Sequence, residues 1–79
     1  MSNALILYSQ LYCPFCIKVL RYLESRDIDI EIRDVMETPK FRDELISIGG
    51  KSQVPCLIID GKPLYESDDI MKWFEEHYE

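Results

Sequence analysis

The sequence predicts a small α/β fold whose elements follow the order βαβ-α-ββ-α. Residues 4–8 are continuously apolar, which is typical of a strand buried on both faces. Residues 28–34 alternate isoleucine with charged side chains, the period of a half-buried strand. The Asp60-Gly61 dipeptide favours a tight hairpin turn. A helix between the first two strands makes them parallel, whereas the hairpin strands are antiparallel, so the predicted sheet is mixed.

Two helices separate these strands. Residues 15–26 carry an apolar stripe at helical spacing, and Pro14 suits a first-turn position because the N–H it lacks needs no partner there. The second helix begins at Thr38-Pro39, with threonine as N-cap and proline at the first helical position. It ends at Gly49-Gly50, because glycine is the usual residue after a helix C-terminus.

The C-terminal third predicts a hairpin followed by a helix. The strands are expected at residues 56–59 and 62–65, the second of them at the edge of the sheet. Ser67 is the predicted N-cap of the last helix, and the acidic pair Asp68-Asp69 in its first turn suits the helix dipole. The expected buried or half-buried face of this helix comprises Ile70, Trp73, Phe74 and His77.

Length and charge limit the classes of function. A chain of 79 residues predicts one domain spanning positions 1–79. The net charge of −6 argues against nucleic acid, because phosphate binding needs a basic surface. The sequence contains no apolar stretch of membrane-spanning length and no N-terminal signal pattern. We therefore expect a cytoplasmic protein that does not bind membranes, with a monomer as the plainest oligomeric state.

Two of the cysteines are the candidate reactive residues. Cys13 and Cys16 lie three residues apart, where the first strand turns into the first helix. The free N–H groups of a helix N-terminus favour a thiolate, which makes Cys13 the predicted nucleophile. Cys16 lies one turn further on and becomes the resolving thiol after Cys13 has formed a mixed disulfide.

The alternatives to a redox-active pair are a structural zinc site and ordinary core packing. A structural zinc site needs four ligands, and Cys56 and His77 do not supply a second Cys-x-x-Cys pair, so no metal is expected. Chance packing of two cysteines in a core is a weaker alternative, because the pair falls at a strand-to-helix turn. Cys56 itself is predicted to be a small buried hydrophobe, with a third reactive thiol as the alternative.

Two loops could support the thiols. Val54-Pro55 is either an ordinary X-Pro loop or a cis proline that faces the thiol site, although the trans isomer is much the commoner. The segment 66–68 is either a helix cap alone or a cap combined with an anion-binding helix N-terminus. The residues by themselves leave both questions open.

Three blocks give the chain a family resemblance. They are Tyr12-Cys13-Pro14-Phe15-Cys16, Gln53-Val54-Pro55 and Ser67-Asp68-Asp69-Ile70. In order and separation they resemble the dithiol type of the glutaredoxin family over nearly the whole chain. The resemblance implies a thioredoxin fold, with a four-stranded mixed sheet flanked by three helices, and a cis Pro55. It also implies a redox-active Cys13–Cys16 disulfide and glutathione-dependent reduction of protein disulfides and protein–glutathione mixed disulfides.

The same resemblance implies a glutathione site. Tyr12 and Phe15 would wall the thiol groove, and Arg42 would meet the glycine carboxylate, which suits the bidentate geometry of arginine. The remaining residues implied to bind glutathione lie in the two supporting loops: Gln53, Val54, Pro55, Glu66, Ser67 and Asp68.

Some positions depart from the glutaredoxin pattern. Gln10 stands where many members have a basic residue, which weakens the expected hold on the glycine carboxylate. Tyr65-Glu66 stands where many have two glycines, and Glu66-Ser67 is similar to the γ-glutamyl-binding pair of the glutathione transferase N-terminal domain. A glutathione-binding module without redox turnover, either transferase-like or an iron–sulfur carrier, is therefore the alternative. Phe15 and Cys16 argue against the carrier, and the dithiol and the lack of a second helical domain argue against the transferase.

Overall fold

The computed structural model describes residues 4–77 and places four strands and three helices in them. In chain order they are β1 (Leu5–Ser9), α1 (Pro14–Ser25), β2 (Glu31–Asp34), α2 (Pro39–Gly49), β3 (Cys56–Ile59), β4 (Lys62–Tyr65) and α3 (Ser67–His77). The strand order across the sheet is β2-β1-β3-β4, with β1 parallel to β2 and the other two pairs antiparallel. The predicted element order and mixed sheet are confirmed.

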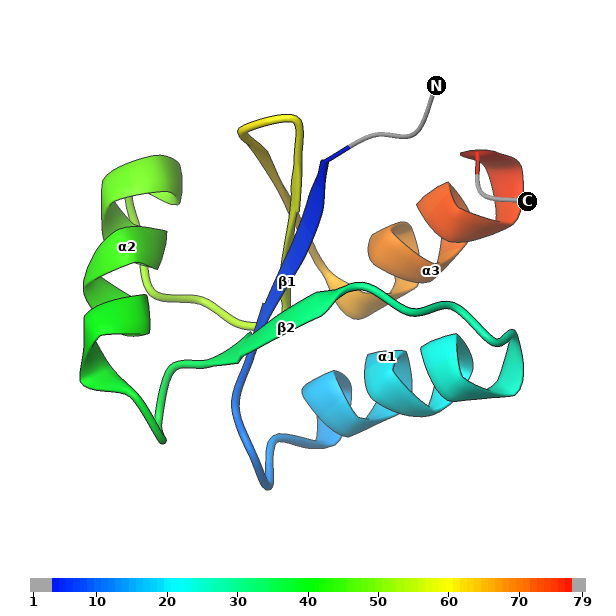
Figure 1. Ribbon diagram of the computed structural model, residues 1–79, viewed down its shortest axis with the longest axis horizontal. Coiled ribbons are helices and arrows are strands. Elements are labelled where there is room, and N and C mark those ends of the chain that lie inside the picture. Colours follow the sequence, from blue (N-terminus) through cyan, green and yellow to red (C-terminus); the bar gives the residue numbers. More distant parts are fainter. Residues whose placement is uncertain (1–3, 78–79) are drawn as a thin grey trace.

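The sheet forms the middle layer of the molecule. Helix α2 covers one face, and α1 and α3 lie side by side on the other (Figure 1). Because successive strand residues point to opposite faces, Leu7 and Leu57 pack toward α1 and α3, whereas Tyr8, Cys56 and Ile58 pack toward α2. The central strands are therefore buried on both sides, as the apolar run at residues 4–8 predicted.

Strand β2 is shorter than predicted. It spans Glu31–Asp34 instead of residues 28–34, and Ile32 is 46% exposed. The reason is its place at the sheet edge, where α1 covers it only in part. Ile28 and Ile30 still pack against the core between α1 and α3, but from an irregular segment.

The last helix also differs from the prediction. Ser67 is not its N-cap: the helix begins at Ser67, and the Glu66 carbonyl accepts the Ile70 N–H at 3.0 Å. Glu66 adopts a left-handed φ of 74°, which turns the chain sharply into the helix. His77 is exposed instead of half-buried, and its ring lies 5.2 Å from that of Trp73.

The second helix begins and ends as expected, and Gly50 ends it with a left-handed φ of 83°. Thr38 occupies its N-cap position without a side-chain capping bond. Leu45 is the fully buried residue of α2, and Phe41 of the same helix packs against the same core cluster. Polar contacts add to this apolar attachment of α2 to the sheet.

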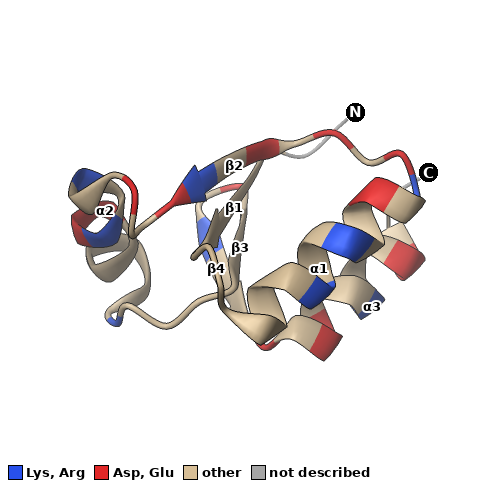
Figure 2. Cartoon of the chain, turned by 90° about the horizontal axis from the view of Figure 1, so that it is seen from below, with Lys and Arg blue, Asp and Glu red and all other residues tan. Residues whose placement is uncertain are grey.

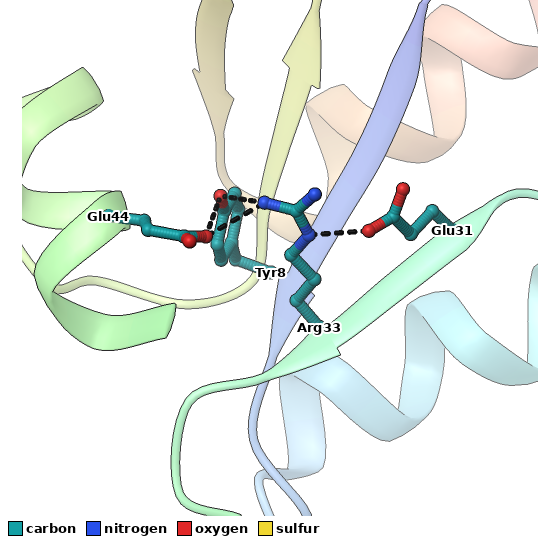
Figure 3. A network of polar contacts seen from close by, with 4 residues as sticks. All are labelled: Tyr8, Glu31, Arg33 and Glu44. Atoms are coloured by element: carbon teal, nitrogen blue, oxygen red, sulfur yellow. Dashed lines mark hydrogen bonds and ion pairs between the residues drawn. The ribbon is translucent and has the colours of Figure 1, made fainter. Parts of the chain in front are cut away.

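A polar network supplies those contacts (Figure 3). The Arg33 Nη1 donates to Tyr8 Oη at 3.1 Å and to Glu44 Oε1 on α2 at 2.8 Å, and Tyr8 Oη donates to Glu44 Oε1 at 3.0 Å. The Arg33 Nε also bonds Glu31 at 2.6 Å, and this bond raises the pKa of the guanidinium. Burial raises the pKa of Tyr8, so its hydroxyl stays a donor. The network ties α2 to β1 and β2.

Lys and Arg occur on the helices and on the sheet, where they are interspersed with Asp and Glu along the chain (Figure 2). Among residues 4–77, no helix is long and apolar enough to cross a membrane.

Candidate active site

Cys13 lies at the junction of β1 and α1. It is the N-cap residue of α1, with extended φ and ψ of −82° and 118°, and its carbonyl accepts the Ile17 N–H at 2.9 Å. Its own N–H donates to the Gln10 carbonyl at 3.2 Å, which closes the preceding turn. The side chain is partly exposed at the helix end where N–H groups lack partners. A sulfur there is accessible and faces a positive dipole end.

Cys16 differs from Cys13 in burial. It is fully buried in α1, and burial raises its pKa to about 12. A hydrogen bond with the Gln10 backbone opposes this shift, whereas the neighbouring Cys13 and Asp34 reinforce it. All three cysteines are free thiols, and the side chains of Cys13 and Cys16 are hydrogen-bonded to each other. The pair therefore combines an accessible thiol with a protected one.

Asp34 fixes the loop in front of Cys13. Its carboxylate accepts the N–H groups of Leu11, Met36 and Glu37 at 3.0, 2.8 and 2.9 Å. Burial alone would raise the pKa of Asp34, but these three donors outweigh it and the pKa is lowered. The carboxylate therefore joins the carboxyl ends of β1 and β2, which lie next to each other because the two strands are parallel.

A groove of about 250 Å³ includes Phe15, which lies between the two cysteines in the chain. It is lined by Phe15, Gln53, Val54, Pro55, Glu66 and Ser67. The Val54–Pro55 peptide bond is cis, as the resemblance implied. Gln53 Nε2 donates to Glu66 Oε2 at 2.9 Å and joins the proline loop to the start of α3. The structure thus brings together six of the residues that the sequence singled out.

Asp68 lies beside this groove but does not line it. Its carboxylate is exposed and pairs with Lys18 Nζ of α1 at 2.8 Å. Lys18 carries no motif signal, because it follows the cysteine pair on a helix surface where lysine is ordinary. Its proximity to Asp68 depends on the packing of α1 against α3.

A second cavity, of about 370 Å³, holds Arg42. Its lining residues are Gln10, Val35, Met36, Pro39, Arg42 and Ser52. Arg42 and Gln10 are the lining residues that the sequence related to the glycine carboxylate. Pro39 stood out in the sequence only as a helix start, and Val35, Met36 and Ser52 did not stand out at all. One signal could have found Val35 and Met36: they follow β2, and the carboxyl ends of parallel strands meet at the same edge of a sheet.

Two further residues lie apart from both cavities. Tyr12 precedes Cys13 with a left-handed φ of 73° and a side chain that is 79% exposed, so it projects from the rim instead of lining the groove. Cys56 is fully buried on the sheet face that carries α2, opposite the face that carries α1, and burial raises its pKa. This placement favours the small-hydrophobe interpretation of Cys56 over a third reactive thiol.

Metal ligands do not gather in the described part of the chain. Residues 4–77 contain no group of three or more His, Cys, Asp or Glu side chains that could hold an ion.

Fold and sequence define the class to which this site belongs. A mixed four-stranded sheet with three helices and a Cys-Pro-Phe-Cys turn at the first helix is a thioredoxin-like architecture. Within that class, residues 5–64 match the family model described as Glutaredoxin. The chain belongs to the glutaredoxin family.

Individual relatives agree with this assignment. An uncharacterised glutaredoxin-like 8.6 kDa protein in the rubredoxin operon of Clostridium pasteurianum is 40% identical over 55 residues, covering 70% of this chain and 73% of that protein. Rice glutaredoxin-C4 (Oryza sativa subsp. japonica, chloroplastic) is 30% identical over 77 residues, covering 89% of this chain and 55% of the rice protein. This chain therefore spans little more than half the length of the rice relative.

Solved structures of glutaredoxins share the fold. Oxidised glutaredoxin 2 from Chlamydomonas reinhardtii superposes with a TM-score of 0.69 at 28% identity, covering 94% of this chain and 73% of that one. A buckwheat glutaredoxin–glutathione complex gives a TM-score of 0.72 at 21% identity, covering 94% of this chain and 70% of that one. At the lower identity the likeness supports the fold alone.

Proposed function

We propose that this glutaredoxin-family protein is a glutathione-dependent thiol–disulfide oxidoreductase with Cys13 as its nucleophile. The observation that carries the proposal is a pair of cavities whose charges are opposite. The groove contributes the Glu66 carboxylate, and the larger cavity contributes the Arg42 guanidinium. Their lining residues flank Cys13 in the chain, with Gln10 before it and Phe15 after it.

Glutathione matches this distribution of charge. Its γ-glutamyl end carries an ammonium group, its glycine end carries a carboxylate, and its cysteine lies between them. The ammonium end would enter the groove near Glu66 and the exposed Asp68, and the α-carboxylate of the same end would face the N–H groups at the start of α3. The glycine carboxylate would reach Arg42. Val54, before the cis Pro55, would pair with the cysteine through its backbone.

The first step is thiol–disulfide exchange. The Cys13 thiolate attacks the glutathione sulfur of a mixed disulfide, a Cys13–glutathione disulfide forms, and the substrate sulfur leaves as a thiolate that takes up a proton. A second glutathione thiolate then attacks the glutathione sulfur of that disulfide. Oxidised glutathione leaves and the Cys13 thiolate returns. The substrate disulfide is reduced and two glutathiones end as one disulfide.

Cys16 would act on protein disulfides. Its sulfur attacks Cys13 in the mixed disulfide, forms a Cys13–Cys16 disulfide and releases the second substrate thiol, and two glutathiones later restore the dithiol. Because burial raises the pKa of Cys16, its thiol is protonated at pH 7. Its proton must therefore pass to the leaving thiolate during the attack. This cost favours the route through Cys13 and glutathione for small mixed disulfides.

The proposal extends to the setting of the protein. Positions 1–79 form one domain that acts as a monomer on glutathionylated or disulfide-bearing proteins, without nucleic acid, membrane or metal. Three free thiols suit a reducing compartment such as the cytoplasm. Support for glutathione as the reductant comes from membership of the glutaredoxin family.

The test is turnover of a small glutathione mixed disulfide, coupled to glutathione reductase and NADPH. We expect activity in the wild type, none in Cys13→Ser, and retained activity in Cys16→Ser. Cys56→Ala is the matched control, because that thiol is buried on the other face of the sheet. Absence of turnover in the wild type would contradict the proposal and would indicate a glutathione-binding module without redox activity.

A further inference from the structure

The cavity that holds Arg42 is larger than a glycine carboxylate requires. Its volume of about 370 Å³ exceeds the 250 Å³ of the groove on the other side of Cys13. Half of its lining residues are apolar: Val35, Met36 and Pro39. Glycine has no side chain with which to cover such a wall. Val35 is already packed in the core, whereas Met36 and Pro39 are exposed and would stay uncovered in the proposed complex with glutathione.

The apolar wall is held in place by hydrogen bonds. Asp34 accepts the backbone N–H of Met36 at 2.8 Å and that of Leu11 at 3.0 Å, which brings these two residues to the same carboxylate. The Met36 side chain, which lines the cavity, is nevertheless 60% exposed, and that of Leu11, which does not line it, is 55% exposed. A large apolar side chain exposed in a cavity wall can cover an apolar group of a ligand. The fixed backbone makes this rim a preformed surface.

The charge of the cavity is simple. Arg42 contributes one positive charge, whereas Gln10 and Ser52 are neutral and polar. No carboxylate belongs to the lining set among the described residues. The chemistry therefore suits a fragment with one carboxylate or carbonyl group for Arg42 and an apolar group for the wall.

We propose that this cavity is a subsite for an apolar residue that follows the reacting cysteine of the substrate. The inference rests on the proposed function and names its preferred substrates: peptide thiols in which the cysteine precedes a residue such as leucine. The apolar side chain would lie against Met36, Val35 and Pro39. A chain end or a backbone carbonyl would meet Arg42. Preference for such peptides over glutathione follows from the extra apolar area that they bury.

The test is binding measured without redox chemistry. The 15N-labelled protein is titrated with S-methylated γ-Glu-Cys-Gly and γ-Glu-Cys-Leu, which cannot exchange disulfides, and affinities are read from amide shifts. We expect the leucine peptide to bind about tenfold more tightly, since burying a few methylenes is worth at least this much. Its largest additional shifts should fall at the Val35 and Met36 amides.

Variants assign the effect to the cavity. Met36→Ala should remove most of the preference for leucine and leave γ-Glu-Cys-Gly binding unchanged, which also shows that the variant is folded. Ile46→Ala, which removes a side chain of α2 that is 41% exposed and lies outside both cavities, should leave the preference intact. Titration of the leucine peptide with a C-terminal amide distinguishes a free chain end from a continuing protein chain: Arg42→Gln should weaken the carboxylate peptide more than the amide.

Different results would overturn the proposed subsite and the proposed oxidoreductase function. Equal binding of the glycine and leucine peptides, or a leucine preference that persists in Met36→Ala, overturns the inference whatever the turnover. A leucine preference that depends on Met36 in a protein without turnover supports the subsite and contradicts the oxidoreductase proposal.

Discussion

The two cavities beside Cys13 differ in how the chain builds them. The groove takes its lining from short segments that each carry a motif: the start of α1, the cis-proline loop and the start of α3. The larger cavity takes its lining from four separate stretches of ordinary composition, and Arg42 is its only charged member among the described residues. A site made of local motifs is readable from sequence, whereas a site made where strand ends meet becomes visible only in the fold.

The two cavities also differ in the chemistry of their lining residues. The groove combines the Glu66 carboxylate with the N–H groups at the start of α3, which in the proposed complex would bind the zwitterionic end of glutathione. The cavity around Arg42 combines one cation with an apolar wall. We therefore expect changes in the groove to depend on the amino group of the ligand, and changes in the cavity to depend on its carboxyl end.

The largest effect should come from reversing the charge of the larger cavity. Arg42→Glu replaces a charge-assisted hydrogen bond, worth about 1.5–3 kcal/mol, with repulsion of the glycine carboxylate. We expect the KM for a glutathione mixed disulfide to rise tenfold or more, with little change for the corresponding glycinamide. An equal loss for both substrates would show that Arg42 acts on the fold and not on the carboxylate.

The next effect concerns the polar network that ties α2 to β1 and β2. Tyr8→Phe removes the hydroxyl that bonds Arg33 and Glu44, and we expect it to lower the free energy of unfolding by about 1 kcal/mol. Urea denaturation measures this. Tyr22→Phe is the matched control, because its hydroxyl accepts one exposed bond, from Arg26 at 3.2 Å, and should cost less. Equal costs would contradict a special role for the network in attaching α2.

A smaller effect is expected in the groove. Glu66→Gln keeps an oxygen atom near Gln53 but removes the negative charge, and an exposed ion pair is worth about 0.2–1 kcal/mol. Binding of S-methylglutathione should weaken up to fivefold. Binding of its deamino analogue, which lacks the ammonium group, should not change. A loss for the deamino ligand as well would remove Glu66 from ammonium recognition.

A gain in ligand affinity, of similar or smaller size, is expected when Gln10 is replaced by lysine. Gln10→Lys places a second cation in the cavity that holds Arg42, where the sequence departs from many glutaredoxins. The affinity for S-methylglutathione should rise about two- to fivefold at low salt, and the gain should shrink as salt screens it. A gain that is insensitive to salt would indicate that the lysine works through packing.

The smallest effect is that of Asp34→Asn on thermal stability, and it depends on pH. The pKa of Asp34 is lowered below its ordinary value of 3.8, so its contribution to stability is present above that pH and is lost as the pH falls through the lower, folded-state pKa. Asp34→Asn should therefore melt at a lower temperature than wild type at pH 7, and the difference should narrow below pH 3.8. Circular dichroism melts from pH 7 to pH 2 measure this, and a constant difference would contradict it.

Much of this molecule followed from local sequence. The apolar run at residues 4–8, the Pro14 helix start, Gly49-Gly50 and Asp60-Gly61 each determine the backbone within a few residues, and the structure has the predicted elements there. The dithiol spacing is likewise local, because one helical turn brings Cys16 to Cys13. Such features depend on dihedral preferences and on hydrogen bonds between near neighbours, and these do not require a particular tertiary structure.

Tertiary structure decided what depends on distant partners. Ile32 is exposed because β2 lies at the sheet edge, and Cys56 is remote from α1 because its strand position points to the other face. Lys18 meets Asp68 only through the packing of α1 against α3. The Met36 backbone is held near that of Leu11, two residues before Cys13, because β1 and β2 are parallel and Asp34 joins their ends. These contacts are set by which strands pair and which faces are covered, and no short stretch of sequence contains that information.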